Sequence, residues 1–573
     1  MRLRRGRADG VGVTVEESGV SSMVIKEDGG NNLYASQGIA ADRNLPTAER
    51  DGAFIPETDE HVPSVNYQFS WKIKIWSHFY SYSPEIWRYL KDIEEENDFI
   101  KKYIKLQHRI DRAEWDDERG VWMFKITDLT TGNVFDDEAE FFINAGGVLN
   151  NWKWPDIPGL KTFQGKLMHS AAYEEGYPLE GKRVAVIGAG SSGVQIVANI
   201  SSKVEKLYHW VRSPIWITAG FAQTWAGKDG ANFEFGLPKK DSPQQRKFLS
   251  DNPKKYLEYR KQIEDELNQR FKFIIKGSPE ATAARTFAAA EMSRKLASNP
   301  DLVDKIIPKT FNPGCRRPTP APGYLDALVA PNATVFTDPI GCVDATGFTD
   351  HEGVHHDVDV IVCATGFDTS WLPRFPFIAH GRDLRELWGG KDGVTSYLSI
   401  AVPTFPNHFS FCGPYGPLGH GSFMPLIEHW TRYILTVLHK TQTEAIKSLS
   451  PSLAAARDFR RHADLFLQRT AWTSPCASWF KAGRTDGQAA VYPGSRVHFF
   501  ELLRRPRYED FEIGYWDETG NRFAFLGNGW AVREGDGSDG TSYLGLLDEE
   551  RGDVRPEYDE GLKDVLAGWA LDS

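Results

Sequence analysis

The feature that most constrains the fold is a Gly-x-Gly-x-x-Gly motif at residues 188–193 and the character of the segments around it. The apolar run at 184–187 predicts a buried strand, and the pattern over 194–200 predicts a helix. Residues 207–212 predict the next strand. Strand, glycine-rich turn, helix and strand follow in the order of a Rossmann-like unit, so the sequence predicts an α/β fold.

The residues of the motif have separate roles in binding a dinucleotide. Gly188 permits the tight turn, Gly190 lets a pyrophosphate approach the backbone, and Gly193 lets the helix pack on the strand. Ser191 and Ser192 begin the helix, where free N–H groups and the helix dipole favour phosphate. The alternative is a glycine-rich turn with only a structural role, which the flanking strands and helix disfavour.

The end of the second strand indicates which coenzyme binds. An acidic residue at this position would bind the ribose 2′-hydroxyl of NAD. Arg212 and Ser213 stand there instead, and an arginine suits the 2′-phosphate of NADP. The sequence therefore favours NADP, with a solvated surface arginine as the alternative.

Other segments predict helices and strands around this unit. Residues 83–105 predict a helix. The turn at Thr131-Gly132-Asn133, between residues 121–128 and 134–143, predicts a β-hairpin. Residues 241–310 are rich in Lys, Glu, Gln and Ala and predict helices, which indicates an insertion in the α/β pattern.

Composition and charge narrow the class of protein. Residues 1–60 are rich in Gly, Asp, Glu, Asn and Ser, which predicts a poorly ordered or atypical segment. The net charge of −11 argues against a nucleic-acid partner. No apolar run reaches the ~18 residues needed to cross a bilayer, and the basic start lacks the apolar region of a secretory signal. We expect a cytoplasmic protein.

The cysteines argue for a reducing compartment. Their number is odd, they are widely scattered, and no Cys-x-x-Cys pair occurs. Neither a disulfide framework nor a zinc site is therefore expected, and no other metal site is predicted. The five residues are Cys315, Cys342, Cys363, Cys412 and Cys476.

Several further motifs coincide in the chain. Residues 163–173, Phe-Gln-Gly-Lys-Leu-Met-His-Ser-Ala-Ala-Tyr, stand just before the glycine-rich motif, and residues 364–368 read Ala-Thr-Gly-Phe-Asp. Residues 314–317 read Gly-Cys-Arg-Arg, and Thr-Pro-Ala-Pro-Gly-Tyr-Leu follows at 319–325. Together they resemble the signatures of class B flavoprotein monooxygenases, and of the Baeyer–Villiger branch of that family in particular.

The resemblance implies two Rossmann-like dinucleotide-binding domains and two cofactors, FAD and NADP. It implies that NADPH is the reductant and that one oxygen atom of O2 enters a ketone to give an ester or lactone. The fungal character of the motifs implies a bulky ketone and a role in secondary metabolism. Two alternatives stay open: an N- or S-oxygenating flavin monooxygenase, and an inactive NADP-binding homologue. The oligomeric state is left open.

The resemblance also assigns roles to residues. Arg317 would supply the fixed positive charge that the chemistry needs, since an arginine stays protonated in a desolvated site. Arg316 would join Arg212 and Ser213 on the 2′-phosphate. The other residues expected at the cofactors are His169, Trp479 and Gly413. For His169 the alternative is a structural histidine that couples domains, and for Trp479 it is a core position.

Domain boundaries follow from the same comparison of motifs. Residues 161–369 are expected to form the NADP-binding domain, with the helical insertion at about 241–310. Residues 61–160 and 370–573 are expected to form the FAD-type domain with a C-terminal extension.

The chain departs from the family pattern at its N-terminal side. Family members open with a FAD-binding Gly-x-Gly-x-x-Gly and then a Gly-Gly-Thr-Trp segment, and neither occurs in residues 1–60. Glu60-His61 stand where Cys-Asp is expected, and that aspartate normally pairs with the catalytic arginine. We therefore expect an incomplete FAD domain that holds FAD weakly. Tyr173 occupies a position where the Baeyer–Villiger branch has tryptophan, which keeps the heteroatom alternative open.

Overall fold

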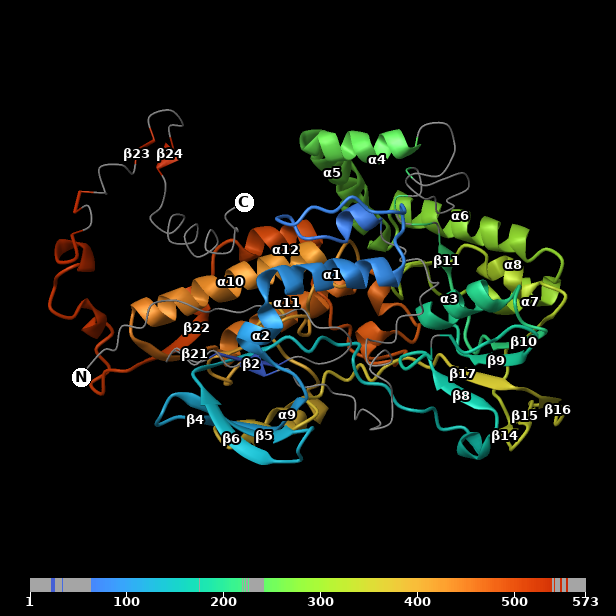
Figure 1. Cartoon of the computed structure of the whole chain (residues 1–573), viewed down its shortest axis with the longest axis horizontal. Coiled ribbons are helices and arrows are strands. Elements are labelled where there is room, and N and C mark those ends of the chain that lie inside the picture. The colour runs from blue at the N-terminus through green and yellow to red at the C-terminus, as the bar shows by residue number, and fades with distance from the viewer. Residues whose placement is uncertain are drawn as a thin grey trace.

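Figure 1 shows a computed structural model of the whole chain. The structure describes residues 63–174, 176–218 and 242–537, a few single residues outside these ranges, and four short strands. The four strands are β1 (Ser22–Ile25), β2 (Leu33–Tyr34), β23 (Leu547–Asp548) and β24 (Asp553–Val554). Apart from β1 and β2, the segment 1–60 that was expected to be atypical lies outside the described residues.

A five-stranded parallel sheet contains the predicted dinucleotide-binding unit. Its strand order is β13-β10-β9-β17-β8. The strands are β8 (Lys166–His169), β9 (Arg183–Ile187), β10 (Lys206–Trp210), β13 (Ala333–Phe336) and β17 (Val360–Cys363). β17 is fully buried and β9 nearly so, because both faces of this sheet are covered and each strand must be apolar on both sides.

Alternate side chains of these strands pack into two hydrophobic cores, one on each face of the sheet. Val184 and Val186 pack with the helices on one face of the sheet. Ala185 and Ile187 pack on the other face, against a small antiparallel sheet. Figure 1 shows the helices above the parallel sheet and the small sheet at its outer side. The helices are α3 (Ser191–Ile200), α6 (Pro279–Lys295), α7 (Pro300–Ile306) and α8 (Tyr324–Leu328), and the small sheet consists of β14 (Cys342–Val343), β15 (Gly347–Thr349) and β16 (His355–Asp357).

The second part of the molecule is built around a long helix, α10 (Met424–Thr443), and strand β7 (Phe141–Asn144). β7 pairs in parallel with β20 (His408–Ser410) and antiparallel with β1. Residues of β7 and α10 share one core with segments on either side of β20 and with the C-terminal elements. Those elements are β21 (Ile446–Pro451), α11 (Leu453–Leu467), α12 (Arg496–Leu503) and β22 (Phe511–Tyr515).

The predicted hairpin forms, but its second strand is shorter than expected. β5 (Val121–Asp128) pairs antiparallel with β6 (Val134–Ala139). The pairing stops at Ala139, and the chain continues as β7 in a different sheet. The apolar run of β7 is buried and suits a parallel strand, whereas β6 is mostly half-exposed. The sheet that contains the hairpin has the order β19-β18-β4-β5-β6, with β4 (His108–Asp116), β18 (Phe377–Ala379) and β19 (Arg382–Asp383).

The helix predicted at 83–105 is divided in two. α1 (Ser83–Asn97) ends at Asp98, whose φ of 57° is left-handed, and α2 (Phe99–Tyr103) follows. Aspartate tolerates this conformation better than most residues, so the sequence permits a break that periodicity alone does not reveal.

The predicted helical insertion is present. α4 (Ser242–Asp251) and α5 (Pro253–Gln269) lie at the top of Figure 1, next to α6. An ion pair joins the half-buried Glu264 of α5 to the buried Arg496 of α12, and the Arg496 Nε also donates to the Asn268 Oδ1 at 2.7 Å. The insertion is therefore fastened to the C-terminal region.

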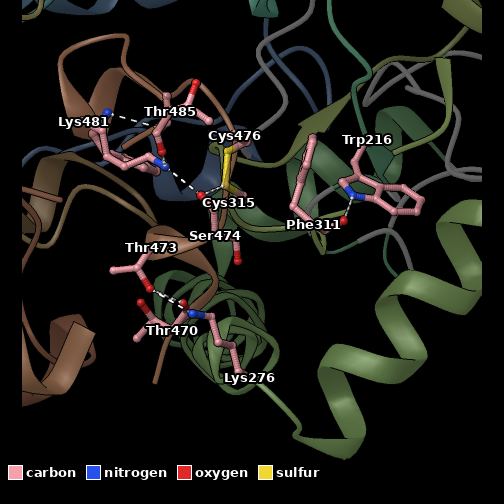
Figure 2. Close-up of a disulfide and its surroundings, with 12 residues drawn as sticks. Trp216, Lys276, Phe311, Cys315, Thr470, Thr473, Ser474, Cys476, Lys481 and Thr485 are labelled. Atoms are coloured by element: carbon pink, nitrogen blue, oxygen red, sulfur yellow. Dashed lines mark hydrogen bonds between the residues drawn. A yellow bond between two sulfur atoms is a disulfide. The ribbon is translucent and has the colours of Figure 1, made fainter. Parts of the chain in front are cut away.

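The expectation about cysteines is wrong in one respect. Cys315 and Cys476 form a disulfide with their Cα atoms 6.4 Å apart (Figure 2). The fold brings together two residues that are 161 positions apart, which spacing along the chain cannot reveal. Because disulfides are rare in reducing compartments, the cysteines do not indicate such a compartment. The cytoplasmic location stays a prediction.

Among the residues that the structure describes, no helix is both long enough and apolar enough to cross a membrane.

Candidate active site

The turn between β9 and α3 has the geometry that a dinucleotide requires. Gly188 has a φ of 112°, and a Cβ there would lie 2.4 Å from the backbone oxygen of Ala364. A Cβ on Gly193 would lie 1.9 Å from the backbone oxygen of Gly188. Gly190, the N-cap of α3, has open space on its Cβ side, and Ser191 and Ser192 form the first turn of the helix. The outer glycines thus serve packing, and the middle one leaves room for a ligand.

Two arginines lie close to each other beside this turn. Arg212 is exposed just after β10, and Ser213 next to it is half-buried. The Arg316 side chain is partly buried, and its Nε has no hydrogen-bond partner among the described residues. Burial, and then the positive charge of Arg212, lower the pKa of Arg316. Two guanidinium groups that repel each other would be stabilised by an anion bound between them, and the 2′-phosphate of NADP is such an anion.

The arginine-bearing segment is tied to the glycine-rich turn. The Ser191 Oγ lies 3.2 Å from the Thr319 Oγ1. Residues Ile217–Thr218 (β11) and Thr319–Pro320 (β12) also pair in parallel. The first contact places the segment that follows Arg317 against the predicted coenzyme turn, and the pairing places it against the segment that follows Arg212.

Arg317 lies near a histidine that the sequence analysis did not select. His420 is 6% exposed, and its Nε2 accepts a hydrogen bond from the backbone N–H of Arg496 at 3.1 Å. Burial, together with the positive charge of Arg317, lowers the pKa of His420 to about 4. The neutral ring therefore carries its proton on Nδ1, an assignment made from the hydrogen bond at Nε2. Nδ1 is buried and has no partner among the described residues, so it is a donor available to a bound group.

The loop before α10 is unusually constrained. Gly413 donates its N–H to the Ser399 backbone oxygen at 3.1 Å, and a Cβ on Gly413 would lie 2.5 Å from that oxygen. Four non-glycine residues of the two contacting segments have positive φ: Leu398, Ser399, Cys412 and Tyr415. Residues in this region of φ are costly and cluster at functional sites. The loop ends at His420 and leads into the N-terminus of α10.

Trp479 begins a short turn in the C-terminal region. Its half-buried ring packs against Phe480, with centroids 4.3 Å apart. Lys481 in the same turn is only 2% exposed, and its Nζ donates to the backbone oxygens of Ser474 and Thr485, each at 2.7 Å (Figure 2). The positive charge of Arg316 also acts on Lys481, so this turn and the arginine pair are close.

His169 occupies a different position. Its ring is fully buried, stacks on Trp152 at 4.4 Å, and lies 3.3 Å from the Thr365 Oγ1 through its Nε2. Burial lowers the pKa of His169 to about 4. The residue joins the 163–173 motif to the 364–368 motif, which fits the coupling role that was the alternative in the sequence analysis.

Comparison with known proteins identifies the family. The profile described as "Flavin-binding monooxygenase-like" matches residues 74–273. The FAD-binding monooxygenase tazF of Aspergillus terreus is 38% identical over 485 residues, which cover 83% of this chain and 84% of that protein. The chain belongs to the flavin-binding monooxygenase family. The resemblance to class B flavoprotein monooxygenases is thereby confirmed.

Other relatives agree with this assignment. A Baeyer–Villiger monooxygenase of Pseudomonas aeruginosa is 29% identical over 82% of this flavin monooxygenase and 84% of its own length. The structure of a cyclohexanone monooxygenase from a Rhodococcus species, bound to NADP+, matches with a TM-score of 0.67 at 25% identity. That match covers 80% of this chain and 91% of the other. The predicted α/β fold with two dinucleotide-binding domains is confirmed.

FAD and NADP are the cofactors of this monooxygenase, and the described residues fit both. Gly190, Arg212 and Arg316 would hold the phosphates of NADP. The unpartnered Nδ1 of His420 and the close-packed loop at Gly413 would hold part of FAD at the N-terminus of α10. Weak retention of FAD stays a prediction, because it concerns residues 1–60.

Proposed function

We propose that this flavin monooxygenase inserts one oxygen atom of O2 into a ketone and gives an ester or lactone, with NADPH as the reductant. The observation that carries the proposal is the placement of Arg317, whose charge acts on the loop before α10 from the segment that also carries Arg316. Arg317 follows Arg316, a proposed NADP contact, and its charge acts on His420, a proposed flavin contact, which supports a role between the two cofactors. The names of the relatives support this reaction type.

The residues of the chain would act by position and charge. Bound FAD, reduced by NADPH, would supply the electrons that activate O2, which no side chain can do. Arg317 would stabilise the negative charge that develops on the carbonyl oxygen of the ketone. His420, neutral at physiological pH, would donate from Nδ1 without adding a second charge. Trp479 would cover the coenzyme and exclude water, which protects the reactive oxygen from loss.

We further propose a bulky ketone of fungal secondary metabolism as the substrate. The support is the fungal character of the motifs and of relatives such as tazF and the FAD-binding monooxygenase stcW of Emericella nidulans, which is 34% identical to this chain. The proposal assigns NADP binding to residues 161–369, and FAD binding to residues 61–160 and 370–573.

Replacement of Arg317 tests the proposal. In the FAD-loaded protein, Arg317→Ala should lower kcat for ester formation by a factor on the order of 10²–10³ and leave NADP+ binding intact. Arg317→Lys should rescue only part of the rate, since lysine is a point charge without the planar fork. The matched control is Arg212→Ala, which should raise the KM for NADPH and leave kcat nearly unchanged. Ester formation by Arg317→Ala at the parent rate would refute the assigned role.

One observation favours a second candidate, an N- or S-oxygenating flavin monooxygenase. Tyr173 stands where the Baeyer–Villiger branch has tryptophan, and it packs against the core of the parallel sheet. Product analysis with a cyclic ketone and with a thioether separates the two reactions, because only one gives a lactone and the other gives a sulfoxide. Binding of NADP+ with neither product would indicate the third possibility, an inactive homologue.

A further inference from the structure

The disulfide joins the two segments that carry the proposed coenzyme contacts. Cys315 directly precedes Arg316, and Cys476 lies just before Trp479 in the C-terminal region. Both cysteines are buried, at 0% and 3% exposure. The bond therefore connects, inside the protein, the segment with the phosphate-binding arginine and the turn with the covering tryptophan.

The C-terminal side of this link is anchored to the helical insertion. Thr470 forms a bridge with Ile275, and the Nζ of Lys276 donates to the Thr473 Oγ1 at 2.9 Å (Figure 2). These contacts fix the chain up to Thr473. The disulfide at Cys476 continues the connection toward the arginine-bearing segment.

Like charges face each other across the link. Burial lowers the pKa of Lys481, the Asp486 carboxylate opposes this shift, and the positive charge of Arg316 adds to it. Arg212 acts on Arg316 in the same sense. The cationic groups of Arg316 and Lys481 therefore repel each other when no anion is bound, although Asp486 offsets part of the charge on Lys481. A covalent bond between them holds the cations together before the phosphate arrives, so binding needs less reorganisation.

We propose that the Cys315–Cys476 disulfide is a positioning cross-link for NADP(H), which holds Arg316 at a fixed spacing from the turn with Trp479 and Lys481. Without the bond, the competent arrangement would be populated in only part of the molecules. The apparent dissociation constant rises by the inverse of that fraction, so a competent fraction of about one tenth weakens binding about tenfold. This inference rests on the coenzyme contacts of the proposed function.

The cross-link makes coenzyme affinity depend on the oxidation state of the two cysteines. Formation of the bond removes one proton and one electron from each thiol. Hydrogen peroxide, a two-electron oxidant, can accept both electrons and both protons and becomes two molecules of water. A dithiol reductant returns the two hydrogens and opens the bond.

Serine variants test the cross-link without any turnover. Cys315→Ser and Cys476→Ser are compared with Cys342→Ser, a change at an exposed free cysteine. Calorimetric titration of each FAD-loaded protein with NADP+ and with NAD+ gives the two affinities. We expect NADP+ to bind about tenfold more weakly to the first two variants, with NAD+ changed by less than about twofold because it lacks the 2′-phosphate. The Cys342→Ser control should match the parent.

Two results would overturn the proposal. If NADP+ and NAD+ lose affinity equally, or if NADP+ affinity stays while the melting temperature falls, the bond is a general structural link. Failure of the protein to oxygenate ketones would not affect these titrations, so it would refute the proposed function alone.

The native protein gives a second route if the serine variants do not fold. Thiol titration of the denatured protein should detect Cys342, Cys363 and Cys412 as free thiols, and should detect all five cysteines after reduction. Reduced and alkylated protein should bind NADP+ about tenfold more weakly, and reoxidation by peroxide before alkylation should restore the affinity. Unchanged NADP+ affinity in the fully reduced protein would contradict the proposal.

Discussion

Two glycines of the turn at 188–193 have opposite predicted sensitivities to the same change. A methyl group at Gly193 would lie 1.9 Å from the backbone oxygen of Gly188, about 1.5 Å short of ordinary contact. Helix α3 or the turn must shift, and overpacking of this kind costs about 2 kcal/mol. A methyl group at Gly190 meets nothing within 4 Å, and the φ of −75° there suits alanine.

Gly190→Ala should therefore leave the melting temperature unchanged and weaken NADP+ binding. The methyl group would stand where the pyrophosphate approaches the backbone. Loss of one charge-assisted hydrogen bond costs about 1.5–3 kcal/mol, which corresponds to roughly 10- to 100-fold in affinity. Gly193→Ala should lower the melting temperature by roughly 4–8 °C.

Calorimetric titration with NADP+ and thermal unfolding of both variants, with FAD present, measure the two effects. Parent-like NADP+ affinity in a well-folded Gly190→Ala protein would refute the assignment of this turn to the coenzyme. A large loss of stability in Gly190→Ala would instead show that Gly190 serves the packing of the turn.

Two further predictions concern stability. Burial lowers the pKa of four histidines from 6.5 to about 4 or below, so below pH 6.5 the unfolded chain binds more protons than the native protein. The free energy of unfolding should therefore fall as the pH drops toward 4, by up to about 1.4 kcal/mol per pH unit for each histidine. Melting temperatures that do not change between pH 7 and pH 4.5 would contradict this. The four are His169, His209, His408 and His420. Glu264→Gln should lower the free energy of unfolding by about 3 kcal/mol, because it leaves the Arg496 guanidinium buried without its carboxylate. The control Asp92→Asn, at an exposed ion pair with Arg88, should not change the denaturation midpoint. Equal midpoints for the two variants would show that the carboxylate of Glu264 does not stabilise the buried guanidinium.

Local patterns in the sequence predicted the parts of the fold that depend on local interactions. The strand, turn and helix around Gly188–Gly193 are contiguous, and each glycine has a role set by its own φ or by a close backbone contact. The break at Asp98 and the end of β6 at Ala139 were missed. In both places tertiary context, rather than the pattern of apolar residues, decides where the element ends.

The candidate site was predicted in part for the same reason. Arg212 follows a strand whose position the βαβ pattern gives, so its place beside the turn was foreseeable. His420 was missed because its role depends on Arg317 and Arg496, which come from distant segments. The disulfide was missed because nothing in the spacing of Cys315 and Cys476 indicates that they meet.

With FAD and NADPH bound, the protein should transfer one atom of O2 to a ketone. The most direct measurement is incubation of the FAD-loaded protein with NADPH, a polycyclic ketone and ¹⁸O2, followed by mass spectrometry of the product. The product should be an ester or lactone that carries one ¹⁸O atom, and Arg317→Ala should not form it. Consumption of NADPH that yields only hydrogen peroxide, or a product without ¹⁸O, would contradict it.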